Sequence, residues 1–151
     1  MSRAIATGIL LWLWVAPASS QSVVTQATLD HVAIQVSDLQ RSVDFYEELF
    51  GLKEQPAPFA GARWLALGNG VMLHLVGNRT APSDHSRWDH IALSCDDMDE
   101  MIKRLDAHHI VWSNMNGGHE PQVRPDGIKQ IFIQDPDGYW IEINDMLKRR
   151  R

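Results

Sequence analysis

Residues 130–145 read QIFIQDPDGYWIEIND, which is two short runs of alternating apolar residues joined by a DPDG turn. Proline presets one turn dihedral and glycine supplies the positive φ that other residues resist, so this stretch predicts a β-hairpin. In the second run, Glu142 would share one face of the strand with Trp140 and Asn144, opposite a face of isoleucines. A carboxylate within so apolar a strand is costly to bury unless it is paired or binds a metal. Glu142 therefore requires a partner from another part of the chain.

The overall composition is that of one soluble, mildly acidic globular domain. The 151 residues include 14 lysines and arginines against 19 aspartates and glutamates, and 44% of the residues are hydrophobic. An acidic chain is a poor partner for nucleic acid, so the expected partner is a small-molecule substrate. Cys95 is the only cysteine, which excludes an internal disulfide, and its place on the aliphatic side of its run indicates a core residue.

The two ends of the chain differ from its body. Arg3 precedes an unbroken apolar block at residues 9–15, and small residues follow that block. This layout is typical of a secretory signal peptide, so we expect residues 1–20 to be cleaved and the remaining domain, residues 27–147, to be exported to the periplasm or secreted. The apolar block is shorter than the ~20 residues of a membrane span, so no membrane contact is expected after cleavage. An uncleaved membrane anchor and a misplaced start codon are the alternatives. Residues 148–151 form a basic tail.

The body of the chain contains the same pattern twice. HVAIQVSDL at residues 31–39 aligns with HIALSCDDM 59 residues later, and NGVMLHL at residues 69–75 aligns with DGYWIEI 68 residues later. An amphipathic helical pattern follows each block of the first pair, and a further strand-like run precedes each block of the second pair. Such duplication predicts an α+β fold of two βαβββ modules, at about residues 29–77 and 88–145.

The short second strand of each module is the least distinct part of this pattern. It is expected near residues 53–55 in module 1 and near residues 110–113 in module 2. Residues 114–127 contain three glycines and two prolines. They predict a long loop, and loops of that length are usually functional or mobile.

Four side chains of the kind that bind metals lie on corresponding strands of the two modules. Alternation places His31, His74, His90 and Glu142 opposite the aliphatic face of their strands. The aliphatic faces can pack under a helix, which leaves the four donors to line one concave surface. One strand histidine alone is more often a hydrogen-bonded core residue, but four donors at duplicated positions favour a metal site. Three imidazoles and one carboxylate suit a single divalent ion of Zn, Ni, Mn, Fe or Co.

At these residues the chain resembles the vicinal oxygen chelate superfamily, which includes glyoxalase I, fosfomycin thiol transferases, extradiol dioxygenases and bleomycin-binding proteins. The resemblance covers about residues 29–145, and its motifs are closest to those of bacterial glyoxalase I. These motifs are DLQRSVDFY at residues 38–46, DHIALS at residues 89–94 and DPDGYWIE at residues 135–142. The resemblance implies paired βαβββ modules that form a metal-containing cup, commonly completed in a homodimer.

By that resemblance, His31, His74, His90 and Glu142 fall on the four metal positions of glyoxalase I, which has a glutamate where His74 stands. The implied function is that of a divalent-metal-dependent lyase or isomerase acting on a hemithioacetal-like or other oxygen-chelating small molecule. Glu142 is the candidate catalytic residue, with Glu142 or a metal-bound hydroxide moving the proton. No substrate-binding residues are predicted.

Three other functions stay open at this point. A fosfomycin-type thiol transferase or an extradiol-type dioxygenase would use three of the four ligands and leave the position of His74 open. A non-catalytic module of the same superfamily would instead sequester a small planar ligand. Trp64, Trp112 and Trp140 are the aromatic walls that such a module would use.

Overall fold

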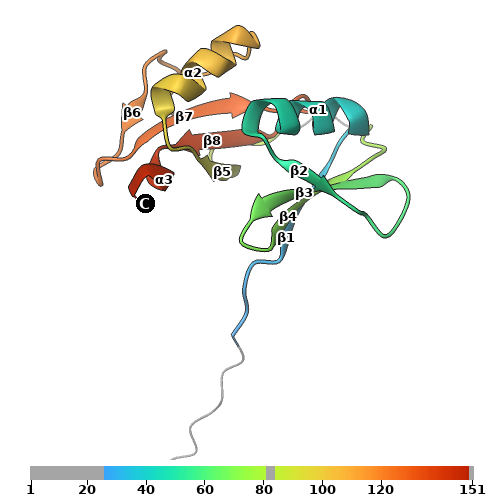
Figure 1. Ribbon diagram of the computed structural model, residues 1–151. Coiled ribbons are helices and arrows are strands. Elements are labelled where there is room, and N and C mark those ends of the chain that lie inside the picture. The colour runs from blue at the N-terminus through green and yellow to red at the C-terminus, as the bar shows by residue number, and fades with distance from the viewer. Residues whose placement is uncertain (1–25, 81–83, 150–151) are drawn as a thin grey trace, which may run out of the picture.

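Each half of the chain forms a four-stranded sheet with a helix packed on one face (Figure 1). The computed structural model describes residues 26–80 and 84–149, so the predicted signal peptide, residues 1–20, lies outside the described residues. The elements in chain order are β1 (His31–Gln35), α1 (Leu39–Phe50), β2 (Lys53–Gln55), β3 (Ala62–Gly68), β4 (Val71–Val76), β5 (His90–Ser94), α2 (Met98–Ala107), β6 (Gln122–Val123), β7 (Lys129–Gln134), β8 (Trp140–Asn144) and α3 (Met146–Arg149). Within the described ranges, no helix combines the length and the apolar character that crossing a membrane requires.

The two sheets have the same topology, with strand orders β1-β4-β3-β2 and β5-β8-β7-β6. In each sheet the first and last strands of the module run parallel, and the other neighbouring strands run antiparallel. The register is also the same, because Ala33 lies opposite His74 in module 1 and Ala92 lies opposite Glu142 in module 2. The predicted α+β fold of two βαβββ modules is therefore confirmed.

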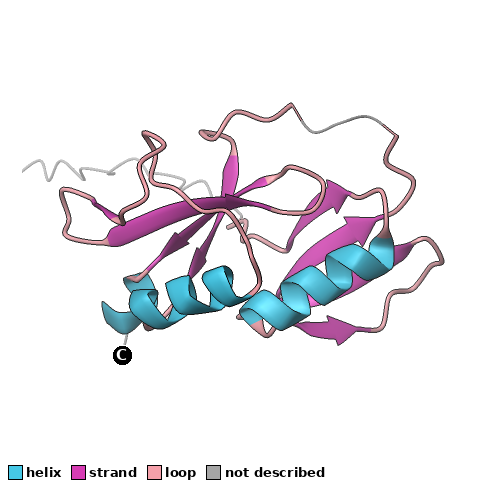
Figure 2. Cartoon of the chain, turned by 90° about the horizontal axis from the view of Figure 1, so that it is seen from above, coloured by secondary structure: helices cyan, strands magenta, loops and turns pink. Residues whose placement is uncertain are grey.

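The helices begin at aspartates and cover the aliphatic faces of the sheets. Asp38 caps α1 by accepting from the backbone N–H of Arg41, and Asp97 caps α2 by accepting from the backbone N–H of Glu100. Seen from above, the two longer helices lie one after the other along one side of the molecule (Figure 2). The core that they cover includes Val43, Leu49, Leu65, Leu73, Leu75, Leu105, Ile131, Ile133, Ile141 and Ile143. The predicted ligand residues lie on the other face of each sheet, because side chains alternate along a strand.

The prediction of a strand near residues 110–113 is wrong. In that run Ser113 forms an isolated bridge, and the second strand of module 2 is instead β6, inside the predicted loop at residues 114–127. A hairpin turn with Gly127 at φ 80° connects β6 to β7 and pairs the two strands. The second strand of module 2 is therefore selected by the turn that pairs β6 with β7, and not by the apolar character of residues 110–113.

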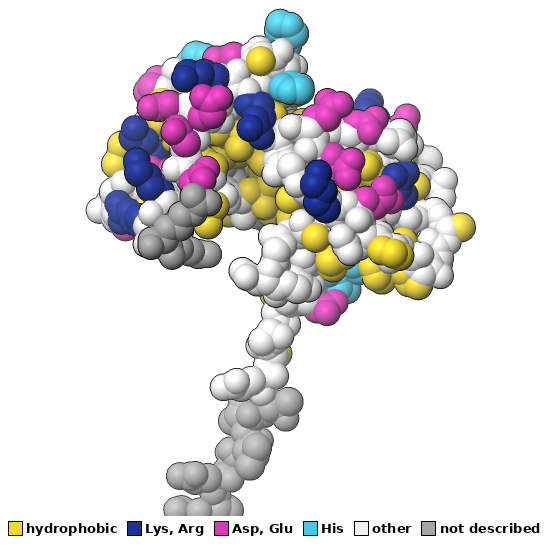
Figure 3. Space-filling view, in the orientation of Figure 1, with side chains coloured by type: hydrophobic (Ala, Val, Ile, Leu, Met, Phe, Trp, Pro, Cys, Tyr) yellow, Lys and Arg dark blue, Asp and Glu magenta, His cyan; other side chains and the backbone are white. Residues whose placement is uncertain are grey.

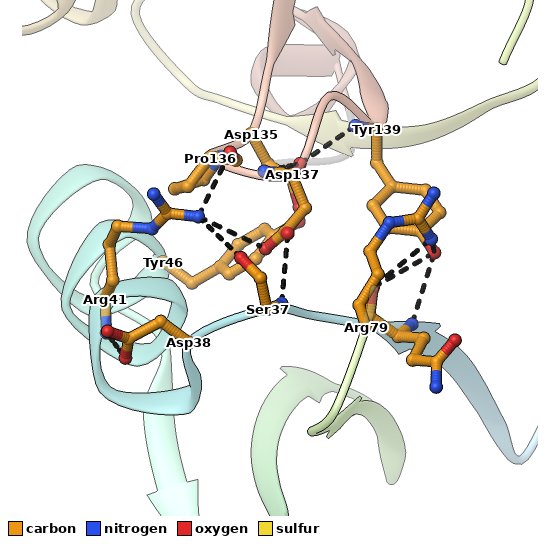
Figure 4. Close-up of polar contacts among 10 residues, drawn as sticks. Ser37, Asp38, Arg41, Tyr46, Arg79, Asp135, Pro136, Asp137 and Tyr139 are labelled. Carbon is orange, nitrogen blue, oxygen red and sulfur yellow. Dashed lines mark hydrogen bonds and ion pairs between the residues drawn. The ribbon is translucent and has the colours of Figure 1, made fainter. Parts of the chain in front are cut away.

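The DPDG turn confirms the predicted hairpin between β7 and β8 and also joins the two modules (Figure 4). Asp137 Oδ1 accepts from the backbone N–H of Ser37 (3.0 Å), and the Arg41 guanidinium lies 3.7 Å from Asp137 Oδ2. The Tyr46 hydroxyl of α1 donates to Asp135 Oδ2 (3.0 Å), and both of these side chains are buried. The turn therefore holds module 2 against the beginning of the first helix of module 1.

Tyr46→Phe is expected to lower the free energy of unfolding at neutral pH by about 1.5–3 kcal/mol, because it leaves a buried carboxylate oxygen without its donor. Burial and the neighbouring Asp135 raise the pKa of Tyr46 well above its ordinary value of 10.0. Above about pH 10 the unfolded chain releases the Tyr46 proton while the folded chain retains it, so wild-type stability falls as the pH rises. The difference between wild type and variant should therefore shrink between neutral and alkaline pH. Urea unfolding of both proteins at neutral pH and above about pH 10 measures the loss of stability and its dependence on pH.

Tyr139→Phe is the matched control for this prediction. The Tyr139 hydroxyl also lies at the contact between the modules, where it accepts from Arg79 Nη1 (2.7 Å), but the side chain is only half-buried. Its removal should cost less, because water can replace it as a partner. A loss of stability in Tyr46→Phe no larger than that in Tyr139→Phe would contradict the assigned role of the buried hydrogen bond.

Candidate metal centre

Module 1 brings His31 and His74 together on the face of its sheet that points away from the helix. Their rings stack with centroids 4.1 Å apart and an angle of 12° between the planes. His31 Nδ1 donates to Asp30 Oδ2 (2.7 Å), which leaves the lone pair of His31 Nε2 free for a metal. Trp64 stacks on the other face of His74, with centroids 4.2 Å apart, so the His74 ring is held between two flat neighbours.

Burial, followed by the neighbouring His31 ring, lowers the pKa of His74 below its ordinary value. The cause is that both effects disfavour the protonated, charged form of the imidazole. His74 is therefore neutral at neutral pH. A neutral imidazole is the form that binds a metal.

Module 2 brings His90 and Glu142 together at the corresponding place. His90 Nε2 lies 3.3 Å from Glu142 Oε2. His90 Nδ1 donates to the backbone carbonyl of Arg87 (2.7 Å), so Nε2, on the side of Glu142, is the ring nitrogen that a metal would bind. Glu142 is 7% exposed, and its other oxygen, Oε1, accepts from Asn144 Nδ2 (2.7 Å) and lies 3.6 Å from Arg124 Nη1.

The structure thus places the four predicted ligands in two pairs, one on each sheet. Across residues 26–80 and 84–149, no group of three or more histidine, cysteine, aspartate or glutamate side chains is arranged to hold a metal ion. The chemistry of the donors still fits a divalent metal, because the pairs offer imidazole nitrogens and a carboxylate oxygen. A hydrogen bond fixes the second donor atom of His31, His90 and Glu142, and stacking holds the His74 ring. Each pair is half of a four-ligand set, and the complete metal site stays a prediction.

The three tryptophans proposed as walls of a planar-ligand site have separate surroundings. Trp112 is buried, stacks on His119 and donates to Asp106. Trp140 carries the Arg87 guanidinium 4.3 Å from its ring centroid, and Trp64 stacks against His74. Of the three, Trp64 stacks directly on a predicted ligand. Because each tryptophan has different neighbours, the structure gives little support to one aromatic pocket formed by all three.

Sequence reasoning missed three side chains around the second pair. Arg87 lies in the linker between the modules, and its carbonyl orients His90 while its guanidinium covers Trp140. Arg124 comes from a segment predicted as a loop, where no pattern pointed toward Glu142. Strand alternation predicts that Asn144 shares its face with Glu142, but it does not indicate that the Asn144 amide donates to the carboxylate.

Two clefts lie away from the predicted ligands. One, of about 530 Å³, lies between α1 and the segment that follows α2, and it is lined by apolar side chains and by polar and charged side chains of both signs. The other is an apolar groove between the modules, lined in part by Phe50, Leu67, Leu93, Cys95 and Met101. Figure 3 shows hydrophobic side chains gathered in the hollow between the two modules.

Cys95 lines this groove and carries a thiol, which can act as a nucleophile, but its surroundings make that thiol unreactive. The side chain is 8% exposed, and burial, assisted by the charge of Asp145, raises the pKa of its thiol to about 11. Because the thiolate is the reactive form, a thiol that stays protonated at neutral pH is a poor nucleophile. The predicted assignment of Cys95 as a core residue agrees with this burial.

Two modules of the same topology, each with one pair of metal-type donors at the same register, are the arrangement expected of the glyoxalase fold. The chain belongs to the Glyoxalase/Bleomycin resistance protein/Dioxygenase superfamily, whose family model matches residues 28–143.

Similar proteins include enzymes named for glyoxalase activity. The chain is 30% identical over 132 residues to "Glyoxylase I 4" of Arabidopsis thaliana, which covers 77% of this chain and 69% of that protein. It is 28% identical over 127 residues to "Lactoylglutathione lyase" of Escherichia coli O157:H7, over 75% of this chain and 88% of that protein. Among solved structures, a glyoxalase/dioxygenase from Nostoc punctiforme superposes with a TM-score of 0.67 at 25% identity, over 84% of this chain and 98% of that one.

Proposed function

We propose that this protein is a divalent-metal-dependent lyase or isomerase resembling glyoxalase I, and that it acts on a hemithioacetal-like or other oxygen-chelating small molecule. One observation carries the proposal. Each module presents two metal-type donors side by side, and the hydrogen bonds at Nδ1 of His31 and His90 leave Nε2 of each ring as the nitrogen that a metal would bind. The relatives named lactoylglutathione lyase support the same reaction class.

The two pairs lie on different sheets of one chain, so we propose that a second copy completes the site. In a symmetric homodimer, the histidine pair of module 1 in each protomer would meet the His90–Glu142 pair of its partner, giving two identical sites. Apolar surface next to both pairs favours such a contact. Leu29 and Trp88, each two residues before a ligand histidine, are 66% and 75% exposed, and a second copy would remove them from water.

When bound, a divalent ion would polarise the carbonyl oxygen of the substrate and stabilise the negative charge that develops there. Isomerisation of a hemithioacetal also moves a proton between neighbouring carbons, which requires a base. Glu142 is the single carboxylate in the proposed set, because His74 stands where glyoxalase I has a glutamate. We therefore assign removal and return of that proton to Glu142, which would act through Oε2, the oxygen on the side of His90, when that oxygen is not bound to the ion. The donor set suits Zn, Ni, Mn, Fe or Co.

The alternative enzymes fit the geometry less well. A thiol transferase or an extradiol-type dioxygenase needs an open coordination position in place of the fourth ligand. His74 is stacked against His31, and Trp64 holds its other face, so in the proposed site the imidazole would occupy the position that such enzymes leave open. A binding module without catalysis remains the main competing function.

An activity assay with reconstituted protein tests the proposal. Wild-type protein loaded with each of the five metals in turn is expected to convert a hemithioacetal of an α-oxoaldehyde into a 2-hydroxyacyl thioester, followed by thioester absorbance. Glutathione and other small thiols are compared as components of the hemithioacetal. If residues 27–147 are exported, as predicted, glutathione need not be the natural thiol. No product with any metal and thiol would overturn the lyase proposal. Binding of less than about a tenth of an equivalent of metal would favour the binding module.

A further inference from the structure

The two oxygens of the Glu142 carboxylate have different surroundings. Oε1 accepts a hydrogen bond from Asn144 Nδ2 (2.7 Å) and lies 3.6 Å from Arg124 Nη1, whereas Oε2 lies 3.3 Å from His90 Nε2. Glu142 and Asn144 are 7% and 6% exposed, so water competes little for this hydrogen bond. One oxygen is therefore held by the protein, and the other is left on the side of His90.

The amide of Asn144 has a fixed orientation. Its Oδ1 accepts from Ser94 Oγ (2.9 Å) and from the backbone N–H of Met146 (3.2 Å), so Nδ2 is the end that faces Glu142. A flipped amide would lose both accepted hydrogen bonds and would place two oxygens against each other. Ser94 lies opposite Asn144 in the parallel pairing of β5 with β8, so the sheet itself brings the orienting hydroxyl into place.

The duplicated fold does not need this amide. Val76, which lies opposite Gln35 in module 1, occupies the position that corresponds to Asn144, and it is 38% exposed. His74, the counterpart of Glu142, is held by ring stacking instead of a hydrogen bond from the same strand. Because the same module folds with a valine here, the asparagine in module 2 calls for a reason beyond folding.

We propose that Asn144, oriented by Ser94, is a positioning residue that occupies Oε1 of Glu142 and so presents only Oε2 to a cation beside His90. Glu142 then acts as a ligand through one oxygen. Arg124 is the lesser holder of Oε1, because its guanidinium is bound to Asp126 (2.6 Å) and lies farther from the carboxylate. This inference rests on the proposed metal-dependent function.

Asn144→Leu tests the proposal, with Gln130→Leu as the matched control. Gln130 lies directly opposite Asn144 in the β7–β8 register, is 7% exposed and shares its face, but its amide donates to Gln122 (3.4 Å) rather than to Glu142. In the full-length protein, Asn144→Leu is expected to weaken Zn²⁺ affinity by about 10–100-fold, measured by competition with a chelator. It should also weaken the visible absorption bands of bound Co²⁺. A freed Oε1 can bind the ion together with Oε2, and Co²⁺ with a higher coordination number absorbs more weakly. Gln130→Leu should match wild type in both measurements.

Ser94→Ala keeps the test informative if Asn144→Leu does not fold. Ser94 is exposed, so its loss should not prevent folding, and it should weaken Zn²⁺ affinity by roughly threefold or more as the amide loses its orienting hydroxyl. Affinities and Co²⁺ spectra of both variants equal to those of Gln130→Leu would overturn the positioning role. If wild-type protein binds no Zn²⁺ or Co²⁺, the proposed function fails first, and that outcome is distinct from a failure of this inference alone.

Discussion

Glu142→Gln is expected to lower kcat by about 10²–10⁴-fold in protein saturated with metal. Glutamine keeps the shape of the side chain, and its oxygen can still accept from Asn144 Nδ2. Its amide nitrogen would then face His90 and carry no lone pair able to take a proton. The substitution thus removes the base while it keeps the packing of β8, where Glu142 is buried.

Metal affinity has to be measured separately, because an amide is also a weaker ligand than a carboxylate. A metal titration of the variant sets the saturating concentration, and kcat is then compared at saturation. Glu120→Gln is the matched control, since Glu120 also accepts from an asparagine amide, Asn114 Nδ2 (2.9 Å), but lies outside the ligand set. Turnover of Glu142→Gln within about twofold of Glu120→Gln would remove Glu142 from the catalytic role.

The fold followed from the sequence because its signals are local and occur twice. Alternation in residues 31–35 and 90–94 fixes which side chains face the helix, and the repeated register puts Ala33 opposite His74 and Ala92 opposite Glu142. The apolar run at residues 110–113 predicts a strand, but within that run the structure has only an isolated bridge at Ser113. The turn at Gly127 selects the partner of β7, and a turn of this kind is a stronger local signal than a short apolar run.

The site was less accessible from the sequence than the fold. Strand alternation shows that His74 and Glu142 occupy matching faces, but it carries no information about the distance between two sheets. The DPDG turn sets that arrangement through Ser37, Arg41 and Tyr46, which lie about ninety to one hundred residues from it in the chain. Such contacts leave no periodic signal, and the same holds for Arg87, which reaches the site from the linker.

The separation of the donors into two pairs leads to a prediction about mixed dimers. Suppose that one chain carries His31→Ala and His74→Ala, and a second chain carries His90→Ala and Glu142→Gln. Each homodimer then lacks one pair at both sites and should be inactive. A mixed dimer has one site without any of its ligands, while its other site receives the intact pair of each chain.

Subunits of the two inactive proteins, exchanged and refolded together in equal amounts, should therefore recover about one quarter of the wild-type activity, since half of the dimers are mixed and each has one working site. Native mass spectrometry confirms that mixed dimers have formed, and the lyase assay measures the recovery. Mixed dimers without activity would mean that each site draws all of its ligands from one chain. Two pairs on separate sheets of a single protomer could then meet only by a rearrangement of the modules, which the contacts of Asp137 and Tyr46 at the DPDG turn oppose.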